Sequence, residues 1–359
     1  MEILMHNEAS LAGAFANCGR DLAPLVIVRR SLPKPNAIFD TYWKFAAERQ
    51  NIYFRRIAGQ PGPWTTDPIL REFKFTNTYR AADRTSQYLI RKVIGADSYN
   101  LRDTVLRILL FKIFNKIATW ELLEEMVGDI KEATFDTVVF DRIFEQALHG
   151  KAAIYSAAYI MPSGPTSIRQ SRKHKMHLQL LVDMLRSNLP ERLADAKSMG
   201  EAYDLLLSIP SIGPFLAYQF VTDLNYSKHF SFSEMEFVVP GPGAKDGIRK
   251  CFANLGDYSE AEAIRWVTER QEVEFGDRDL RFASLWGRAL QLIDCQNVFC
   301  EVDKYSRVAH PEALGRSGRT RIKQRFSPTP APVATIAPLF PAKWRLAIDS
   351  TSPATFAGF

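Results

Sequence analysis

The stretch LLLSIPSIGPFLAYQFVTDL, residues 205–224, contains two apolar segments separated by a short turn. The first segment ends at Ile209, the turn covers residues 210–213, and Pro214 begins the second segment. Both segments are predicted to be buried helices, and proline suits the first helical position because the N–H that it lacks would be unpaired there. Such a turn presents backbone N–H groups at a helix N-terminus, which favours anion binding, although a plain buried hairpin is the alternative. The candidate phosphate-binding residues are Ser211, Ile212 and Gly213.

Length and composition are those of a soluble globular protein. The chain has 359 residues, of which 46% are hydrophobic and 24% are charged, so it can hold one large domain or two ordinary ones. The formal net charge of +6 favours a polyanionic partner such as DNA, although many basic proteins bind no nucleic acid. No GxxxxGK[S/T] sequence occurs, so a Walker A kinase site is not expected in this chain.

The cysteines and the apolar runs bear on metal sites and on the cellular compartment. The four cysteines form no CxxC pair, so neither a zinc site nor a disulfide framework is expected. A low cysteine count fits an intracellular, reducing compartment, cytoplasmic or nuclear. No apolar run approaches the roughly 18 residues of a membrane span, and no signal-peptide core is present. We therefore expect an intracellular protein with no membrane partner and no metal.

Changes in composition divide the chain into three regions. Residues 1–60 are predicted to be a variable lead-in, in which the aromatic and basic mixture at 37–58 favours an amphipathic helix over a base-stacking surface. Residues 61–325 are predicted to form the helical domain, with the hairpin at 203–224. Residues 326–359 are rich in proline and alanine and are predicted to be a disordered tail.

Two basic clusters are candidate phosphate contacts. Residues 316–325 contain arginine and lysine without any acid, and such a run can lie along a nucleic-acid backbone with an affinity that falls as salt rises. Residues 169–177 are also basic and precede a helix predicted over residues 178–189. Phosphate contact and a solvated loop are equally consistent with this second cluster.

The helix predicted over residues 77–93 is apolar apart from a dense group of polar side chains. Arg80 and Asp83 lie three residues apart and would share one face of it. A surface ion pair worth less than about 1 kcal/mol is the plain interpretation, but the density of polar side chains favours a functional face. Arg80 and Asp83 are therefore candidate catalytic residues, and Asn77 and Arg84 are candidate substrate-binding residues.

A further set of candidates follows the hairpin. A Gly-Pro-Gly turn precedes a helix predicted to begin near Asp246, and the N–H groups of this turn can hold phosphate or pyrophosphate. Glu234 and Glu236 come just before the turn, where a carboxylate is unfavourable unless it accepts a proton or faces a cation. These two glutamates are the candidate acid–base residues, and a solvent-exposed approach to the helix is the alternative. The candidate anion-binding residues here are Gly241, Gly243, Lys245 and Arg249.

The stretch LQLIDCQNVFCEVDKYSRV, residues 290–308, is predicted to be a helix in which polar residues alternate with periodic apolar ones. Buried polar groups at this density must hydrogen-bond to one another, because each one left without a partner costs free energy. The candidate substrate-binding residues on this helix are Gln296, Asn297, Glu301, Lys304 and Arg307.

Four blocks together resemble one protein family. They are DPIL…FTNTYRAADRTSQYLI (67–90), IPSIGPFLAYQFVTDLNY (209–226), EFVVPGPGAKDGI (236–248) and LQLIDCQNVFCEVDKYSRV (290–308). Their order and spacing over residues 60–325 are similar to the 5-hydroxymethyl-deoxyuridine (5-hmdU) DNA kinase helical domain and the allied alpha-glutamyl/putrescinyl thymine pyrophosphorylases. The hairpin also resembles the helix-hairpin-helix of the DNA-glycosylase superfamily, usually written Leu-Pro-Gly-Ile/Val-Gly, with Ser211 at the first glycine.

The resemblance implies an all-α, DNA-glycosylase-like fold with a helix-hairpin-helix, acting on thymine-type bases in phage DNA. In the family scheme a separate kinase activates the hydroxymethyl group of the base, and an amine or amino acid then displaces pyrophosphate. No cofactor is implied, and pyrophosphate is the leaving group. On this scheme the hairpin turn holds DNA with the base flipped out, and the Gly-Pro-Gly turn with Lys245 and Arg249 neutralises pyrophosphate. Glu236 or Asp83 would deprotonate the amine.

Two departures from the glycosylases disfavour base excision. Lyase-type glycosylases place a lysine two residues after the second glycine of the hairpin, where this chain has Phe215. Glycosylases also place an essential aspartate further along, where this chain has Ser233. Three functions stay open at this point: amine transfer to an activated base, a non-catalytic DNA-binding module that partners a separate kinase, and excision of modified thymine.

Overall fold

Helices make up almost all of the regular structure, which confirms the predicted all-α fold. The computed structural model describes residues 30–95, 99–163, 172–327 and 337–348. The longer helices in these ranges are α2 (Ala37–Ile57), α5 (Leu101–Phe114), α6 (Ile117–Val127), α7 (Thr137–His149), α8 (Lys173–Arg186), α9 (Leu189–Asp195), α10 (Met199–Leu207), α11 (Pro214–Leu224), α12 (Pro242–Cys251), α13 (Glu260–Glu269) and α15 (Leu292–Ala309). The shorter elements, with η for 3₁₀ and π helices, are β1 (Lys34–Pro35), α3 (Pro68–Glu72), η1 (Arg80–Ala82), α4 (Arg84–Tyr88), η2 (Leu89–Ile94), η3 (Glu132–Thr134), β2 (Phe252–Asn254), α14 (Gln271–Gly276) and η4 (Ala342–Trp344). Among the residues described, no helix combines the length and the apolar character that crossing a bilayer requires.

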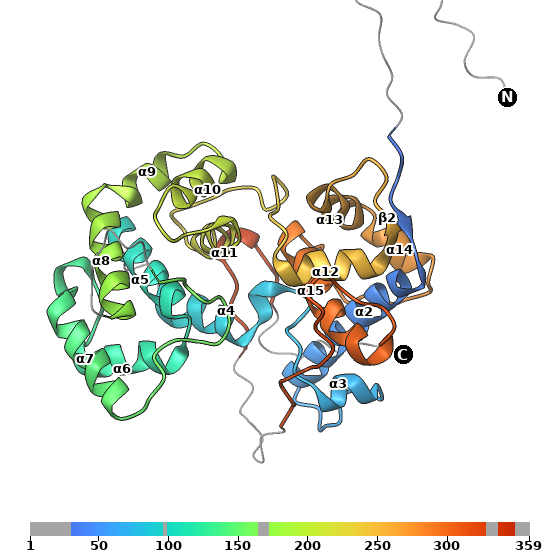
Figure 1. The fold of residues 1–359 in the computed structure, drawn as a ribbon, viewed down its shortest axis with the longest axis horizontal. Coiled ribbons are helices and arrows are strands. Elements are labelled where there is room, and N and C mark those ends of the chain that lie inside the picture. Colours follow the sequence, from blue (N-terminus) through green and yellow to red (C-terminus); the bar gives the residue numbers. More distant parts are fainter. Residues whose placement is uncertain (1–29, 96–98, 164–171, 328–336, 349–359) are drawn as a thin grey trace, which may run out of the picture.

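The helices form two groups that lie side by side (Figure 1). Helices α5 to α11 pack on one another in the first group. In the second group α15 packs against α2, α12 and α13, and β1 pairs antiparallel with β2. Between the groups lies η1, from which Arg80 reaches both: its backbone N–H donates to Asp294 in α15 and its guanidinium donates to Asp223 in α11.

Helix α2 belongs to the core of the second group. Tyr42 and Trp43 are fully buried, and the Tyr42 hydroxyl donates to the carbonyl oxygen of Cys295 in α15 at 3.2 Å. The amphipathic helix predicted over residues 37–58 is therefore confirmed. It is part of the packed helical domain, although residues 1–60 were expected to be a lead-in.

The predicted helical hairpin forms, with α10 packed against α11. Its turn needs a left-handed backbone at Ser211, where φ is +71°. A residue with a Cβ pays about 1 kcal/mol in this region relative to glycine, which explains why glycine is usual there. Ile212 is 3% exposed and anchors the turn in the core, whereas Gly213 is exposed. The turn thus presents its backbone at the surface.

The helix predicted over residues 77–93 is divided into η1, α4 and η2. Asp83 causes the first division, because its backbone is extended, with φ −68° and ψ 150°. Its side chain accepts the N–H of Asn77 at 2.6 Å, a local hydrogen bond that competes with the helical pattern. The three-residue spacing of Arg80 and Asp83 therefore does not place them on one helical face.

Helices α8 and α12 begin earlier than predicted. Helix α12 starts at Pro242 with Gly241 as its N-cap, so the Gly-Pro-Gly turn is the first turn of this helix. Proline at the first helical position explains the early start. Helix α8 starts at Lys173, so the end of the basic cluster at 169–177 lies in its first turn, and residues 169–171 of that cluster lie outside the described residues.

Residues 337–348 come from the region predicted to be a disordered tail, and they pack between the two helical groups (Figure 1). Phe340 is only 6% exposed. Gln87 in α4 exchanges two hydrogen bonds with the backbone of Leu339. Lys343 donates to two backbone carbonyl oxygens beyond the C-terminus of α11. These contacts hold the segment in place despite its proline-rich surroundings.

We expect Ser211→Gly to raise the free energy of unfolding by about 1 kcal/mol, because glycine adopts the +71° φ of this position without strain. Urea denaturation followed by circular dichroism measures the change. Ser208→Gly is the matched control, since Ser208 has an ordinary φ of −70° and its hydroxyl donates to the Leu205 carbonyl oxygen. That variant should be less stable than the wild type, and an equal loss in both variants would contradict the prediction.

Candidate active site

A buried ionic network joins the two helical groups. The Arg80 guanidinium donates two hydrogen bonds to the Asp223 carboxylate, at 2.6 and 3.0 Å. It also donates to Gln219 Oε1 at 3.1 Å and to the Tyr226 hydroxyl at 3.0 Å. Lys112 of α5 contacts the same carboxylate at 3.0 Å. These five buried residues are called the Arg80 network below: Arg80, Lys112, Gln219, Asp223 and Tyr226.

The Arg80 network contains more positive than negative charge. Two cations, Arg80 and Lys112, contact one carboxylate, that of Asp223. Burial opposes ionisation of Asp223, but Arg80 and Lys112 outweigh burial and lower its pKa. Burial also lowers the pKa of Lys112, although Asp223 opposes this shift. Arg80 is bound by protein groups on several sides, and its predicted catalytic role stays a prediction.

A second polar cluster surrounds Asp83, between η1 and α4. Asp83 Oδ1 accepts the Asn77 N–H at 2.6 Å, and the Asn297 amide donates to the Asn77 carbonyl oxygen at 2.9 Å. One turn along α15, Glu301 accepts the Thr76 N–H at 3.1 Å. Glu301 also pairs with Lys304 at 2.6 Å. The structure thus brings together predicted residues from two distant blocks of the sequence. Together with Arg49 these residues are called the Asp83 cluster below: Asn77, Asp83, Asn297, Glu301 and Lys304.

The Asp83 cluster holds a carboxyl group that titrates near neutrality. Burial raises the pKa of Asp83 from 3.8 to about 7, against the opposing effects of the Asn77 N–H and Arg49. A carboxyl with such a pKa can accept a proton at physiological pH. Arg49 Nη1 and Asn77 Oδ1 are buried polar atoms without a hydrogen-bond partner among the described residues. Because buried polar atoms are nearly always paired, these two mark a place for a ligand or water.

The first turns of α11 and α12 meet beside the hairpin. A Cβ on Gly241 would lie 2.5 Å from the Phe215 ring, and one on Gly243 would lie 2.4 Å from Cys300 Sγ in α15. Only glycine permits such close approaches without a shift of the neighbours. Both helices begin with Gly-Pro, and the N–H groups of a first helical turn have no acceptor within the helix. The residues of this contact are called the Gly-Pro corner below: Gly213, Phe215, Gly241, Gly243 and Cys300.

Tyr159 connects the Gly-Pro corner with both polar clusters. Its half-buried ring stacks on Phe215, with 5.7 Å between centroids and 8° between planes. Lys112 Nζ lies 4.7 Å from the centre of the Tyr159 ring. Burial raises the Tyr159 pKa to about 12, and the charges of Arg80 and Asp83 also act on it. Its φ of +55° is uncommon for a residue with a side chain, and such conformations cluster at functional sites.

The two glutamates predicted as acid–base residues have other partners. Glu236 accepts the N–H groups of Met199 and Gly200 at 2.8 and 2.9 Å, and so caps the N-terminus of α10. This position also favours its negative charge through the helix dipole. Glu234 pairs with Arg288 at 2.8 Å. Neither carboxylate hydrogen-bonds to the Asp83 cluster, and a catalytic role for either stays a prediction.

The side chains of the remaining predicted residues do not join the Asp83 cluster. Lys245 and Arg249 are exposed along α12, and Arg84 is exposed at the start of α4. Gln296 is buried in α15, and its Oε1 has no partner among the described residues. Arg307 pairs at 2.5 Å with a carboxylate one turn earlier in α15. None of these five side chains hydrogen-bonds to Asp83.

Several residues of the site were not found from the sequence. Lys112 and Asp223 are charged residues inside strongly apolar helices, and that isolation is the signal that could have found them. Asp294 accepts the Arg80 N–H at 2.8 Å and so fixes η1 on α15, and burial raises its pKa to about 6. Tyr159 lies in a loop without any sequence pattern that would mark it.

The chain is similar to one protein family over most of its length. The family model described as "5-hmdU DNA kinase, helical domain" matches residues 36–315. The chain is 26% identical over 302 residues to the 5-hmdU DNA kinase of Bacillus phage SP10, in an alignment that covers 78% of this chain and 46% of that protein. The chain therefore spans about half the length of this curated relative. No solved structure matches the chain.

We expect Asp223→Asn to lower the free energy of unfolding by about 3–5 kcal/mol, because it leaves Arg80 and Lys112 buried without a counter-charge. Urea denaturation measures the loss. Glu269→Gln is the control, because Glu269 forms an exposed pair with Arg265 at 3.7 Å whose loss should cost less than about 0.5 kcal/mol. Equally small effects of the two substitutions would show that the network does not need Asp223.

Asp83 should make the protein less stable as the pH rises. Its pKa of about 7 in the folded state exceeds 3.8, so at intermediate pH the folded state keeps a proton that the unfolded state has released. Stability then falls by about 1.4 kcal/mol per pH unit between these two values. Asp83→Asn removes this contribution, so the variant should gain stability relative to the wild type from about pH 4 to about pH 7. Urea denaturation at a series of pH values tests this, and parallel profiles would contradict the raised pKa.

Proposed function

The chain belongs to the family of the 5-hmdU DNA kinase helical domain, and we propose from this membership that it acts in thymine hypermodification of phage DNA. The proposed reaction is the displacement of pyrophosphate from an activated 5-methylene-uracil base in DNA by an amine or amino acid. A separate kinase would supply the activated base. The observation that carries this proposal is the carboxyl group of Asp83, whose pKa is raised to about 7 and whose charge acts on Tyr159, the residue that stacks on Phe215 of the Gly-Pro corner.

The Gly-Pro corner is the proposed contact for the DNA strand and the leaving group. Gly213 is exposed at the hairpin turn, and the adjoining first turns of α11 and α12 offer N–H groups to phosphate oxygens. The excess positive charge of the Arg80 network lies behind Tyr159, which stacks on Phe215 of the corner. This buried positive charge would favour the negative charge that develops on departing pyrophosphate.

Asp83 is the proposed base. The nitrogen lone pair of the amine forms a bond to the 5-methylene carbon, the carbon–oxygen bond to pyrophosphate breaks, and pyrophosphate leaves with that electron pair. The extra proton on the amine nitrogen passes to Asp83, whose pKa of about 7 matches this task. Two buried atoms of the Asp83 cluster without partners, the donor Arg49 Nη1 and the acceptor Asn77 Oδ1, have the hydrogen-bonding character to recognise an O4 and an N3–H of the uracil ring.

A non-catalytic DNA-binding module is the second candidate. The alignment covers 46% of the related 5-hmdU DNA kinase, so the chain corresponds to only part of that protein. A module of this kind would present the base to a kinase and would bind DNA through the same Gly-Pro corner. Base excision is the third possibility, and Phe215 and Ser233 at the glycosylase positions disfavour it.

One experiment separates these functions. The full chain is incubated with DNA that carries 5-pyrophosphorylmethyl-uracil and with a mixture of small amines, and the DNA is then digested to nucleosides for mass spectrometry. We expect a new aminated nucleoside together with released pyrophosphate. Binding in a gel-shift assay without any product would support the module instead, and a released free base would support excision.

Asp83→Asn should slow formation of the aminated nucleoside at least about 100-fold while DNA binding persists, because a general base contributes roughly this factor. Glu236→Gln is the comparison, since it alters the other predicted base, whose oxygens cap α10. The Glu236→Gln rate should stay within a few-fold of the wild type. An unchanged rate in Asp83→Asn would reject Asp83 as the base, and loss of product only in Glu236→Gln would assign that role to Glu236.

A further inference from the structure

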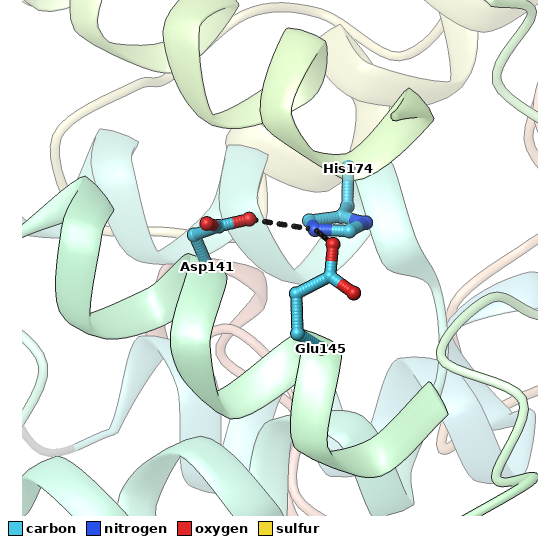
Figure 2. Close-up of side chains that lie close together, drawn as sticks. All are labelled: Asp141, Glu145 and His174. Carbon is cyan, nitrogen blue, oxygen red and sulfur yellow. Dashed lines mark hydrogen bonds and ion pairs between the residues drawn. The ribbon is translucent and has the colours of Figure 1, made fainter. Parts of the chain in front are cut away.

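A cluster of potential metal ligands lies in the first helical group, away from the candidate active site. Among the described residues, Asp141, Glu145 and His174 bring three ligand atoms within 4.8 Å of one another. Asp141 and Glu145 lie one turn apart on α7, and His174 lies in the first turn of α8, which packs against α7. Figure 2 shows both carboxylates directed at the same edge of the His174 ring.

The distances in this cluster are close to those of a metal site. His174 Nε2 lies 2.8 Å from Asp141 Oδ1 and 3.5 Å from Glu145 Oε1. Ligand atoms at about 2.1 Å from a tetrahedral metal are about 3.4 Å from one another. The contact to Glu145 already has about this length, and the contact to Asp141 would need to open by about 0.6 Å.

We propose that Asp141, Glu145 and His174 bind a divalent transition-metal ion such as Zn²⁺. One imidazole nitrogen and two carboxylate oxygens suit this class of ion, and a water molecule would complete a tetrahedral site. His174 is only 2% exposed, so its ring is already oriented by packing, including an edge contact with Phe144 at 5.8 Å between centroids. The two carboxylates balance the charge of the ion and remain partly accessible for its entry.

Two basic side chains compete with the ion. Arg172 Nε lies 2.9 Å from Glu145 Oε1, the same oxygen that faces His174, so this side chain must move when the ion binds. Its side chain is 49% exposed and can turn into solvent. Lys175 pairs with the other oxygen of Asp141, Oδ2, at 3.1 Å, and can remain there.

The ion would connect α7 with α8 and would take no part in base chemistry. Both helices lie at the outer side of the first group, away from α12 and α15 (Figure 1). An ion that binds only the folded state adds to stability by mass action. The sequence predicts no metal site, because its cysteines are unpaired and its histidines are scattered, and the packing of α7 on α8 is what brings these three residues together.

Titration of the chelator-treated full chain with Zn²⁺ tests this site. We expect one equivalent to bind in calorimetry and the Tm to rise by about 4 °C at a hundredfold excess over Kd. Co²⁺ should give the intense visible absorption of a tetrahedral site. Glu145→Gln should weaken Zn²⁺ binding at least about tenfold without unfolding the chain, because Glu145 is partly exposed.

Glu312→Gln is the matched control. Glu312 also faces a histidine, His310, at 3.8 Å, but it lies outside the cluster and is largely exposed, so its substitution should leave binding unchanged. Arg172→Ala should bind Zn²⁺ at least as tightly as the wild type, because it removes the side chain that must move when the ion binds. Absence of stoichiometric binding, or equal binding by the wild type and Glu145→Gln, would show that the cluster is only a set of ion pairs.

Discussion

The carboxylate of Asp223 is the counter-charge on which the junction of the two helical groups depends. It lies in α11 and binds Arg80 from η1 and Lys112 from α5, all in the absence of solvent. Burying three charges is costly, and close pairing with additional hydrogen bonds is what makes it tolerable. Once Arg80 is held in this way, its backbone N–H faces Asp294 in α15. One residue therefore connects both groups, through its side chain on one side and its backbone on the other.

The same junction determines where Asp83 lies. In a continuous helix Arg80 and Asp83 would share one face, three residues apart. The extended backbone at Asp83 separates them instead, so that Arg80 enters the buried network and Asp83 faces Asn77 and the polar side of α15. Asp83 is thereby partly buried without an ion pair to a cation, and burial raises its pKa to about 7 although Arg49 opposes the shift. The break in the helix thus creates the group with the most useful chemistry in the site.

The glycines of the Gly-Pro-Gly sequence have a packing role that the motif alone does not reveal. Gly241 lets α12 approach Phe215, and Gly243 lets it approach Cys300 in α15. The close approach also brings the N-terminal turn of α12 beside that of α11. Tight packing and an anion-binding surface are therefore compatible uses of the same residues, because the missing Cβ atoms serve the first and the free N–H groups serve the second.

The sequence by itself determined most of the helices, the hairpin and the family, because apolar periodicity, prolines at helix starts and the order of four motif blocks are all encoded locally along the chain. It also identified most residues of the Asp83 cluster, since Asn77, Asp83, Asn297, Glu301 and Lys304 stand out as polar residues in otherwise apolar stretches. Only the tertiary structure decided which charge binds which. Lys112 and Asp223 come from separate helices, and Glu236 meets the start of α10 instead of the candidate site. These pairings depend on how helices pack across the fold, and no local pattern records that packing.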